Sequence, residues 1–476
     1  MITLPTTFAD FPGAPDITKI LLDLISDDLA SVQKRKARDG VRYYSGDHDI
    51  QSKKRTYFDK HRKEQTDETK ENNKPVNNFH ADFVDEKVFY VLGQAPSYTS
   101  TDPELASDLG KALDLSFFET LQDSVEGASN KGSEFLYCYV EDGSFKVAVM
   151  PFEELIIIRD RSISERITDI IRYYEIELID GAETVKRYRV EWYKPEGVSY
   201  YQQNKDGDFY PDETELQNPR PYLIKSNLID GKKIPFESSL WGDPPRLPFV
   251  EIRNNRRRTT DLERIRSLQD IYNSIEAGFF DNISDVQEVL LSVSGATAED
   301  PAQLSDNLRY YKLAQFDDEK GRIEAVKVEI PVEAREAALK RLHRDIHHFG
   351  KAVLFDPEKY PQSPSGVALK FLYSRLDAKA DDVITSLKSA LETIVELFRY
   401  FQKWKDGREY QKDAFVEWSF NKSQIFNEIE KIDGAQKSKD IVSDETILAH
   451  HPFVTDVSDE LTKLEKQNEG MINLDE

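Results

Sequence analysis

Apolar positions between residues 261 and 404 recur at spacings of three and four, the period of an α-helix that buries one face. This pattern predicts a helix over 261–285, a second over 331–349, and a third that begins at Ser363-Pro364 and extends to Trp404. The predicted buried stripes are Leu262, Ile265, Leu268, Tyr272, Ile275 and Phe279; then Ala338, Leu342, Ile346 and Phe349; then Val367, Phe371, Leu376 and Ala380.

Start and stop signals agree with this periodicity. Thr260 followed three residues later by Glu263 is typical of a capping box at a helix N-terminus. Pro331 suits the first position of the second helix, and Gly350 suits the left-handed residue just after its end.

The residues between the first two helices have a different pattern. VLLSVSG, LRYYKLAQF and RIEAVKVEI favour three short strands within 286–330, and a polar hairpin at Asp317 to Gly321 separates the last two. A small β insertion between two helices is therefore expected.

Upstream, helical periodicity predicts helices over 16–44, from Phe79 to about Gly93, and over 105–130. Residues 52–74 are highly charged and poor in large apolar groups, which predicts a solvated, mobile excursion. From 133 to 250 the period changes to alternation around Asp-Gly and similar turns, which predicts antiparallel strands. A strand-like FVEWSF and a charged helical tail follow the third helix, so the fold class is α+β.

Composition narrows the classes of function. The 476 residues carry a formal net charge of −24, which argues against wrapping the outside of a nucleic-acid duplex but not against a pore that lets one slide through. The single cysteine, Cys138, cannot form an internal disulfide, and a small buried strand residue is its expected role. We expect no signal peptide and no membrane span, and synthesis in the cytosol.

Motifs for catalysis are missing. The sequence has no GxxxxGK[ST], GxGxxG after a strand, HExxH, GxSxG or CxxC, so it does not indicate a P-loop NTPase or another enzyme. His343, His347 and His348 with Asp345 could hold a metal, but a polar patch at a helix end or facing a pore is the favoured interpretation. Two interpretations fit Arg256, Arg257 and Arg258. They could contact a phosphate or a partner, or they could form a solvated arm that pairs with an acidic neighbour, and the second interpretation is favoured.

Five stretches in order then resemble one family, the portal (head-to-tail connector) proteins of long-tailed bacteriophages, of the type found in phages of Gram-positive bacteria. Each stretch alone is unspecific, whereas five in the family's order are specific. They are YYSGDHDI at 43–50, KPVNNFHADFVDEKVFYVLG at 74–93, NNRRRTTDLERIRSLQDIYN at 254–273, SPSGVALKFLYSRLDAKA at 363–380, and IVSDETILAHHPFVTDVSDE at 441–460.

The resemblance implies a mainly helical portal fold with wing, stem, clip and crown regions and an antiparallel β portion in the wing. It maps the wing to 1–255, β-rich from about 133. It maps the stem helices to 256–285 and 331–350, and the clip to 286–330. It also maps a tunnel loop to 351–364, a long helix to 365–404, and the crown and C-terminal tail to 405–476.

For function, the resemblance implies a non-enzymatic dodecameric ring at one capsid vertex, without cofactor, catalytic site or metal, through which double-stranded DNA is packaged and later leaves. Expected partners are the terminase large subunit, head-completion and adaptor proteins, and scaffolding and major capsid proteins. The expected locations are the virion and, during assembly, the host cytoplasm. DNA-facing candidates are Lys351, Lys359 and Tyr360, and clip candidates for terminase or adaptor contact are Asp317, Asp318, Glu319, Lys320 and Arg322. A capsid or scaffold interaction protein without a channel and a metal-dependent nuclease are the alternatives.

Overall fold

A computed structural model of the chain describes residues 16–59, 61–68, 70–160, 162–180, 183–215, 217–229, 232–286, 290–294, 322–326, 331–354, 366–422, 428–439, 441–449, 451, 454, 457 and 460–464. Its contacts divide the chain into two units. The first unit contains 1–41, 82–263 and 350–476, and the second unit contains 42–81 and 264–349.

Helices of the first unit begin and end at residues suited to those positions. Asp16, Asp102 and Asp114 accept hydrogen bonds from backbone amides at the starts of α1, α4 and α5, and Gly132 closes α5 with a φ of 91°. The helices are α1 (Ile17–Ala30), α2 (Val32–Tyr44, which continues into the second unit), α3 (Phe79–Leu92, which begins in the second unit), α4 (Pro103–Ala112), α5 (Leu115–Lys131), α9 (Gly366–Asp406), α10 (Glu428–Lys437) and α11 (Asp444–Ala449).

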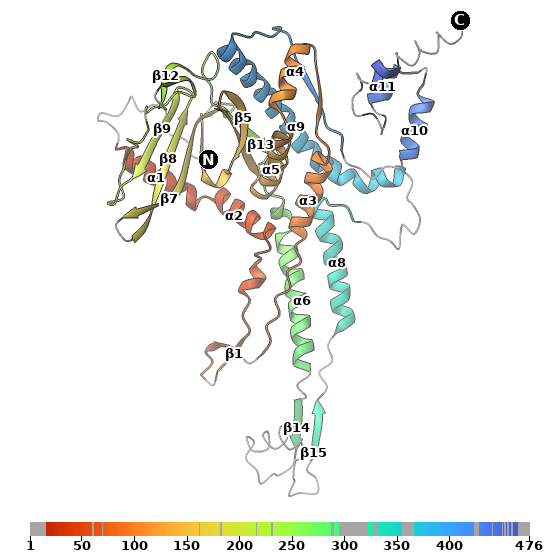
Figure 1. Ribbon diagram of the computed structural model, residues 1–476. Coiled ribbons are helices and arrows are strands. Elements are labelled where there is room, and N and C mark those ends of the chain that lie inside the picture. The colour runs from red at the N-terminus through yellow and green to blue at the C-terminus, as the bar shows by residue number, and fades with distance from the viewer. Residues whose placement is uncertain are drawn as a thin grey trace. The chain divides into compact units, whose positions relative to one another are not determined.

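The strands of the first unit pair antiparallel, as the alternating pattern predicts (Figure 1). A five-stranded sheet has the order β10-β9-β8-β7-β6, with β6 Leu155–Arg159, β7 Ile167–Asp180, β8 Glu183–Lys194, β9 Gly197–Gln203 and β10 Phe209–Pro211. A three-stranded sheet has the order β13-β4-β5, with β4 Ser133–Glu141, β5 Ser144–Met150 and β13 Phe249–Arg253. Two-stranded sheets pair β11 (Leu223–Ile229) with β12 (Lys232–Ser239) and β16 (Val416–Ser419) with β3 (Ser97–Ser100).

The largest hydrophobic core of the first unit forms around α9. Leu387, Leu391 and Ile394 of α9 are fully buried, in one cluster with Leu121 of α5 and Leu136 of β4. Helix α9 contacts β13, and α5 contacts β4 (Figure 1). The apolar residues at spacing four within 105–130 belong to this core or pack against it, namely Leu109, Leu113, Phe117, Leu121 and Val125.

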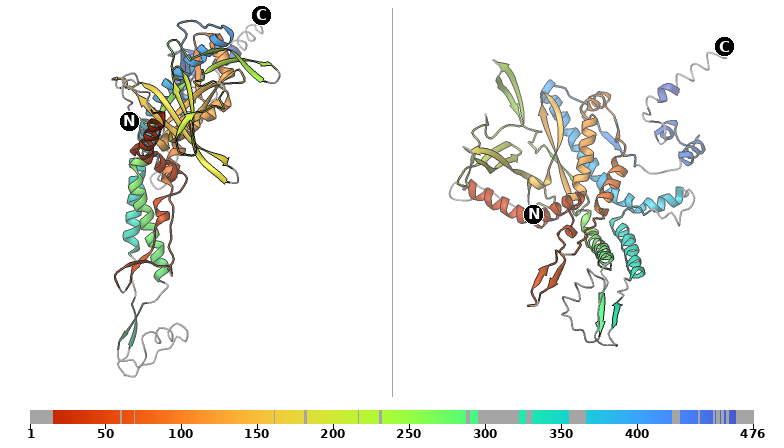
Figure 2. Two further views of the ribbon diagram at one scale, coloured as in Figure 1. Left: turned by 90° about the vertical axis from the view of Figure 1, so that its left-hand side faces the viewer. Right: turned by 60° about the horizontal axis from the view of Figure 1, so that its bottom comes forward.

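The second unit is built on two helices, α6 (Arg266–Val286) and α8 (Val332–Gly350), which lie side by side in Figures 1 and 2. Arg335 of α8 donates to the carbonyl of Gly278 on α6 at 3.2 Å. The unit also contains the short 3₁₀ turn η2 (Asp49–Ser52), the hairpin β1 (Thr56–Phe58) with β2 (Glu64–Thr66), and the antiparallel pair β14 (Leu290–Ser294) with β15 (Arg322–Val326).

The three predicted central helices are α6, α8 and α9, but the first begins at Arg266 and not at residue 261, because Leu262–Arg264 form a separate 3₁₀ turn. Two of the three strands predicted between α6 and α8 are β14 and β15. The third, LRYYKLAQF, lies outside the described residues, as do Ser363 and Pro364. Two long helix predictions were wrong in detail. The helix expected over 16–44 breaks at Ser31, where the backbone is extended, and the one over 105–130 breaks where Asp114 caps α5.

Other sequence predictions are corrected by the local contacts. Residues 52–74 contain the β1–β2 hairpin, whose strands pair through backbone groups and need no apolar side chains. Gly350 is the last residue of α8, and Lys351 takes the left-handed conformation with a φ of 57°. Phe349 and Phe371 were expected to be buried but are 53% and 78% exposed.

None of the described helices is long and apolar enough to cross a membrane.

Candidate functional site

The structure describes only part of the predicted site. Lys351 directly follows α8, and Arg322 opens β15 opposite Ser294. Lys359 and Tyr360, and Asp317 to Lys320, lie outside the described residues, as does the side chain of Arg322. The site can therefore be built around residues 350–354, the stretch that leads from α8 into 355–365.

A buried cluster of charged side chains lies beside this stretch in the first unit. The carboxylate of Asp261 accepts from the ammonium groups of Lys87 on α3, at 2.7 Å, and Lys379 on α9, at 3.0 Å. Asn254 joins them, since its Nδ2 donates to Asp261 at 3.0 Å and its Oδ1 accepts from Lys87 at 2.6 Å. The cluster thus ties α3, α9 and the loop after β13 together.

Electrostatics make Asp261 the centre of this cluster. Burial would raise the pKa of its carboxyl, but the ammonium groups of Lys379 and Lys87 outweigh burial and hold that pKa well below its ordinary value. Two lysines around one carboxylate leave an excess positive charge. Lys379 also donates to the carbonyl of Gly350 at 3.2 Å, and the carbonyls at the end of a helix carry partial negative charge that offsets part of this excess.

A second contact fixes the same stretch. The two carboxylate oxygens of Glu86 on α3 each lie 3.3 Å from the amide nitrogen of Val353, which donates to them. Burial raises the pKa of Glu86, while the Val353 amide works in the opposite direction. Gly350 and Val353 are therefore held by side chains of two different helices, and the chain enters 355–365 from a fixed position.

The sequence analysis missed these lysines because lysines are usually solvated. Their spacing carried the signal. Lys87 lies three or four residues from Phe83, Val84 and Val91, on the face that is buried in α3, and Lys379 lies likewise between Leu376 and Val383 on α9. A lysine on a predicted apolar face indicates a buried ion pair, because a lone buried charge is costly.

The second unit has a buried polar seam along α6, formed by Gln269, Asn273 and Asp281. Asn273 Oδ1 accepts from the backbone amide of Asn77 at 3.0 Å, and Asn273 Nδ2 lies 3.2 Å from His48 Nδ1. His48 stacks on Tyr43 with ring centroids 4.5 Å apart, and its Nε2 lies 3.0 Å from the Tyr43 carbonyl. Two stretches that carry the family resemblance, 43–50 and 254–273, therefore meet through side chains.

The seam continues along α6 to Asp281. Its carboxylate accepts from Lys53 at 2.5 Å and from the backbone amide of Asn73 at 2.9 Å. Burial would raise the pKa of Asp281, but the hydrogen bonds from Lys53 and Asn73 lower it. The charged stretch 52–74 is thus attached to α6 by specific polar contacts, which its composition did not predict.

The histidines of α8 pack on an aromatic ring. The rings of His343 and His347 lie 4.4 Å apart, and Phe79 meets each edge-on at 5.7 and 5.9 Å. Burial lowers the pKa of His343. In the part of the chain that the structure describes, no three His, Cys, Asp or Glu side chains gather closely enough to hold a metal ion.

Arginine 258 pairs with an acidic neighbour, which confirms the favoured interpretation for that residue. Its guanidinium donates to both carboxylate oxygens of Glu251, at 2.6 and 3.1 Å, and Arg159 donates to the same carboxylate at 2.9 Å. The capping box is also confirmed, since the Thr260 amide donates to Glu263 at 3.0 Å and the Glu263 amide to Thr260 Oγ1 at 3.3 Å. Cys138 is buried in β4, as expected.

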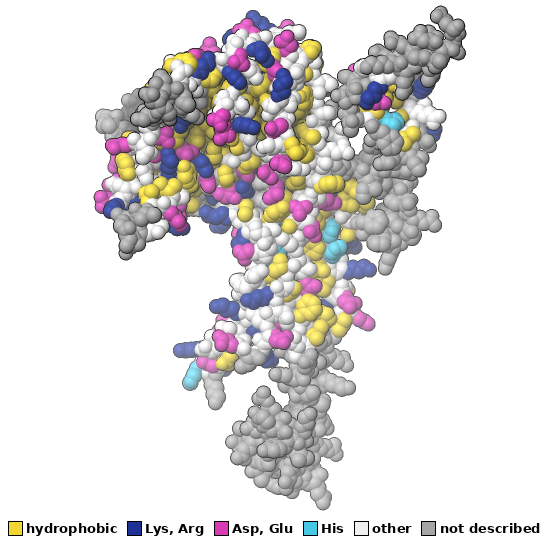
Figure 3. Space-filling view, viewed as in Figure 1, with side chains coloured by type: hydrophobic (Ala, Val, Ile, Leu, Met, Phe, Trp, Pro, Cys, Tyr) yellow, Lys and Arg dark blue, Asp and Glu magenta, His cyan; other side chains and the backbone are white. Residues whose placement is uncertain are grey.

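Over the face of the first unit seen in Figure 3, lysine and arginine side chains are interspersed with aspartate and glutamate. This mixed surface fits a protein with 64 basic and 88 acidic residues.

Comparison with known proteins gives consistent results. The model of the family described as "Phage portal protein, SPP1 Gp6-like" matches residues 28–473. The portal protein of Bacillus phage SPP1 is 30% identical over 432 residues, which cover 90% of this chain and 82% of that protein. The portal protein of Clostridium phage phiCD119 is 25% identical, over 81% of this chain and 83% of that protein. Among solved structures, a chain from the neck of a native GTA particle computed with C12 symmetry has a TM-score of 0.39 and 10% identity, covering 79% of this chain and 91% of that chain.

Proposed function

This chain belongs to the SPP1 Gp6-like family of phage portal proteins, and we propose that it forms a dodecameric ring with a central DNA channel at one vertex of the capsid. Portal proteins are structural assembly components that form oligomeric rings. The observation that carries the proposal is the family match over residues 28–473. The order of elements supports it, with helix α6, a β insertion, helix α8, a short connection and the long helix α9.

The family resemblance suggests which region each element forms. We assign α6 and α8 to the stem, 286–330 with β14 and β15 to the clip, and 351–364 to the tunnel loop. The wing is 1–255, α9 is the long helix at 365–404, and 405–476 forms the crown and tail. The buried cluster around Asp261 then holds Gly350, which directly precedes the segment assigned to the tunnel loop.

Exposed apolar side chains on α6 support a ring. Ile271, Phe280 and Ile283 are each between 43% and 49% exposed in the single chain. Phe280 and Ile283 lie three residues apart and so are neighbours on the helix surface, where exposed apolar groups mark a surface for another protein that a second copy of the chain in a closed ring would cover.

The proposed partners meet different regions. Double-stranded DNA passes through the channel, the terminase large subunit and later the head-completion and adaptor proteins bind the clip, and scaffolding and major capsid proteins meet the ring at the vertex. The ring resides in the virion and assembles in the host cytoplasm. The chain itself carries no proposed catalysis and needs no cofactor.

Electron microscopy of the purified protein tests the ring directly. Class averages viewed down the axis should show twelve subunits around an open centre. A ring with a closed centre would favour the alternative of a capsid or scaffold interaction protein without a channel. Particles that remain monomeric with scaffold and capsid proteins present would contradict the proposal.

Substitutions test the tunnel loop and the clip separately. Lys359→Ala with Tyr360→Ala should lower DNA packaging while rings still assemble. The matched change in the clip, alanine at Asp317, Asp318, Glu319, Lys320 and Arg322, should weaken terminase binding in a pull-down with assembled rings. Unchanged packaging or unchanged terminase binding would remove the corresponding assignment.

A further inference from the structure

The β11–β12 hairpin stands apart from the other sheets of the first unit. Its strands pair only with each other among the described strands, so each has an edge that no third strand covers. The register shifts between Lys225 and Ser226, which pair with Glu237 and Pro235, so that Phe236 is the extra residue of a β-bulge. Isolated two-stranded hairpins are only marginally stable in water, and free edges invite pairing with another chain.

The hairpin is buried at its root and exposes large apolar side chains on β12. Leu223 and Trp241 at the root are buried, whereas Ile234 and Phe236 are 45% and 61% exposed. In the left view of Figure 2 the yellow-green hairpin projects from the body of the first unit. Two exposed large apolar residues on a projecting arm are the pattern expected of a contact with another molecule.

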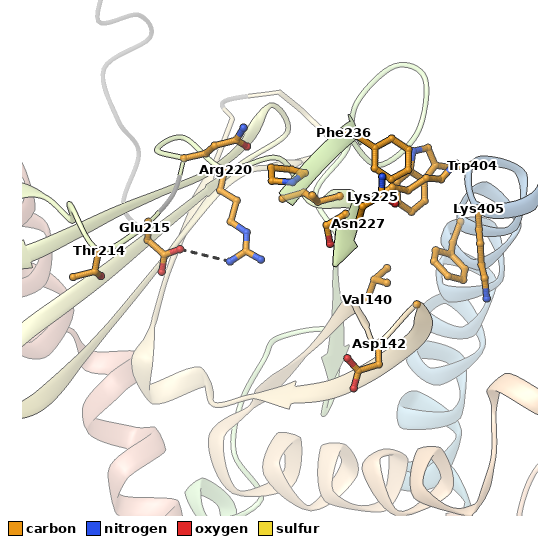
Figure 4. A pocket seen from close by; sticks show the side chains of 16 residues that line it. Val140, Asp142, Thr214, Glu215, Arg220, Lys225, Asn227, Phe236, Trp404 and Lys405 are labelled. Carbon is orange, nitrogen blue, oxygen red and sulfur yellow. Dashed lines mark ion pairs between the residues drawn. The ribbon is translucent and has the colours of Figure 1, made fainter. Parts of the chain in front are cut away.

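A cavity of about 920 Å³ beside the hairpin accounts for the exposure of Phe236 (Figure 4). Phe236 and Lys225 lie on its hairpin side, and Trp404 and Lys405 come from the end of α9. Lys225 lies 4.8 Å from the centre of the Trp404 ring and pairs with Glu237 at 3.1 Å. Phe236 lines this cavity, so packing within the chain leaves its ring partly exposed.

A groove of about 550 Å³ between α9 and β16 has an apolar lining that is complementary to the exposed apolar side chains of the hairpin. Val395, Phe415 and Val416 give it an apolar lining, and Phe415 is 58% exposed. Trp418 is 5% exposed, and its indole Nε1 has no hydrogen-bond partner among the described residues. A buried donor of this kind costs free energy until an acceptor reaches it. Strand β16 pairs only with β3 among the described strands, so it too has a free edge.

We propose that the β11–β12 hairpin of one subunit docks into the α9–β16 groove of the next subunit, an inference that rests on the ring proposed above. A ring closes through heterologous contacts, in which one surface of each subunit meets a different surface of its neighbour. A projecting apolar arm and an apolar groove on the same unit satisfy this requirement. The free edge of the hairpin can also pair with the free edge of β16 through backbone hydrogen bonds.

Charge favours the same pairing. The hairpin segment 223–239 contains Lys225, Lys232 and Lys233 against Asp230 and Glu237, a net charge of +1. The groove has Glu392, Glu396 and Glu417 against Lys388 and Arg399, a net charge of −1. Arg399 already donates to the carbonyl of Gln411 at 2.7 Å, and Glu392 and Glu417 at the groove are exposed.

Cysteine cross-linking in assembled rings tests the contact. Cys138 is the single native cysteine and is fully buried, so it gives little background. Phe236→Cys with Phe415→Cys, treated with a short bis-maleimide, should give a ladder of covalent oligomers on a denaturing gel. Phe236→Cys with Leu115→Cys is the matched control, because Leu115 is also exposed but lies outside the groove, and it should stay monomeric.

Assembly measurements give a second readout. Ile234→Ser with Phe236→Ser should raise the subunit concentration for half-maximal assembly roughly tenfold, since about 1.4 kcal/mol per interface corresponds to that factor. Ile163→Ser, at a fully exposed site outside the hairpin and groove, should leave it unchanged. Two outcomes would overturn hairpin docking and leave the portal proposal intact. In one, rings of Phe236→Cys with Phe415→Cys form but give no ladder of covalent oligomers. In the other, the cysteine at position 236 links to a scaffold or capsid protein. Failure of the wild-type chain to form any ring would overturn both proposals.

Discussion

Helices α6 and α9 have similar apolar periodicity but bury different kinds of side chain. On α9, Leu387, Leu391 and Ile394 are fully buried in the largest core of the first unit. On α6, full burial falls on Gln269, Asn273 and Ala277, while Ile271 is 49% exposed. Packing within the first unit therefore covers the apolar face of α9, whereas α6 buries polar side chains and leaves apolar residues outside its periodic stripe exposed.

This difference separates two sources of stability. Burial of aliphatic groups in α9 gains free energy from the area removed from water. Each hydrogen bond in the polar seam of α6 contributes less free energy, because it replaces a hydrogen bond to water. A buried polar group that loses its hydrogen-bond partner, however, lowers the stability of the fold. We infer that α9 stabilises the single subunit and that the exposed apolar residues of α6 contact another subunit in the assembled ring.

The largest effect is expected where α9 buries a charge. Asp261→Asn should lower the free energy of unfolding by about 3–5 kcal/mol, because Lys87 and Lys379 lose their shared carboxylate inside the protein. Urea denaturation at neutral pH measures this. The matched control Asp381→Asn removes an exposed carboxylate of α9, 2.8 Å from Lys422, and should change the value by less than about 1 kcal/mol. Equal effects would show that burial does not distinguish the two pairs.

Truncation of an apolar residue compares the two helices directly. Leu391→Ala in α9 should cost about 2–5 kcal/mol, since it leaves a cavity in a packed core. Ile271→Ala in α6 should cost well under that in the isolated subunit, about 1 kcal/mol or less, because the side chain is half exposed. Thermal denaturation of unassembled protein measures both. A larger loss for Ile271→Ala would contradict the assignment of that side chain to an open surface.

The polar seam should respond to loss of one amide. Asn273→Ala should cost about 1–3 kcal/mol, because the amide of Asn77 and the ring of His48 lose a buried partner. Hydrogen exchange of residues 73–80 should rise with it, which distinguishes loss of this contact from general destabilisation. The neighbouring Ser274→Ala is exposed and serves as the control. Unchanged exchange in Asn273→Ala would mean that other contacts hold this stretch.

Acid pH should narrow the gap between wild type and Asp261→Asn. The folded pKa of Asp261 lies below its ordinary 3.8, so its contribution is fully present above pH 3.8 and is lost as pH falls toward the folded value. Below pH 3.8 the wild type should lose about 1.4 kcal/mol per pH unit relative to the variant. A gap that narrows already between pH 7 and 5 would require a different titrating group.

Much of the fold followed from short-range patterns. The central helices, the Thr260–Glu263 capping box and the hairpin at Asp142-Gly143 all depend on residues within a few positions of one another. The period of apolar residues and the chemistry of caps and turns are local properties, so one sequence contains them. The order of five motifs likewise indicated the portal family, which the match over residues 28–473 establishes.

Tertiary contacts decided the rest, and they join residues far apart in the chain. Lys87, Asp261 and Lys379 have the composition of surface charges until α3, α9 and the loop after β13 bring them within hydrogen-bond distance. Asn273 and His48 are likewise joined across more than two hundred residues. The stripes predicted which residues recur on one face of α6, α8 and α9, but not which face is covered. Phe349 and Phe371 are exposed because periodicity fixes the direction of a side chain on its own helix, while burial requires a second element on that side.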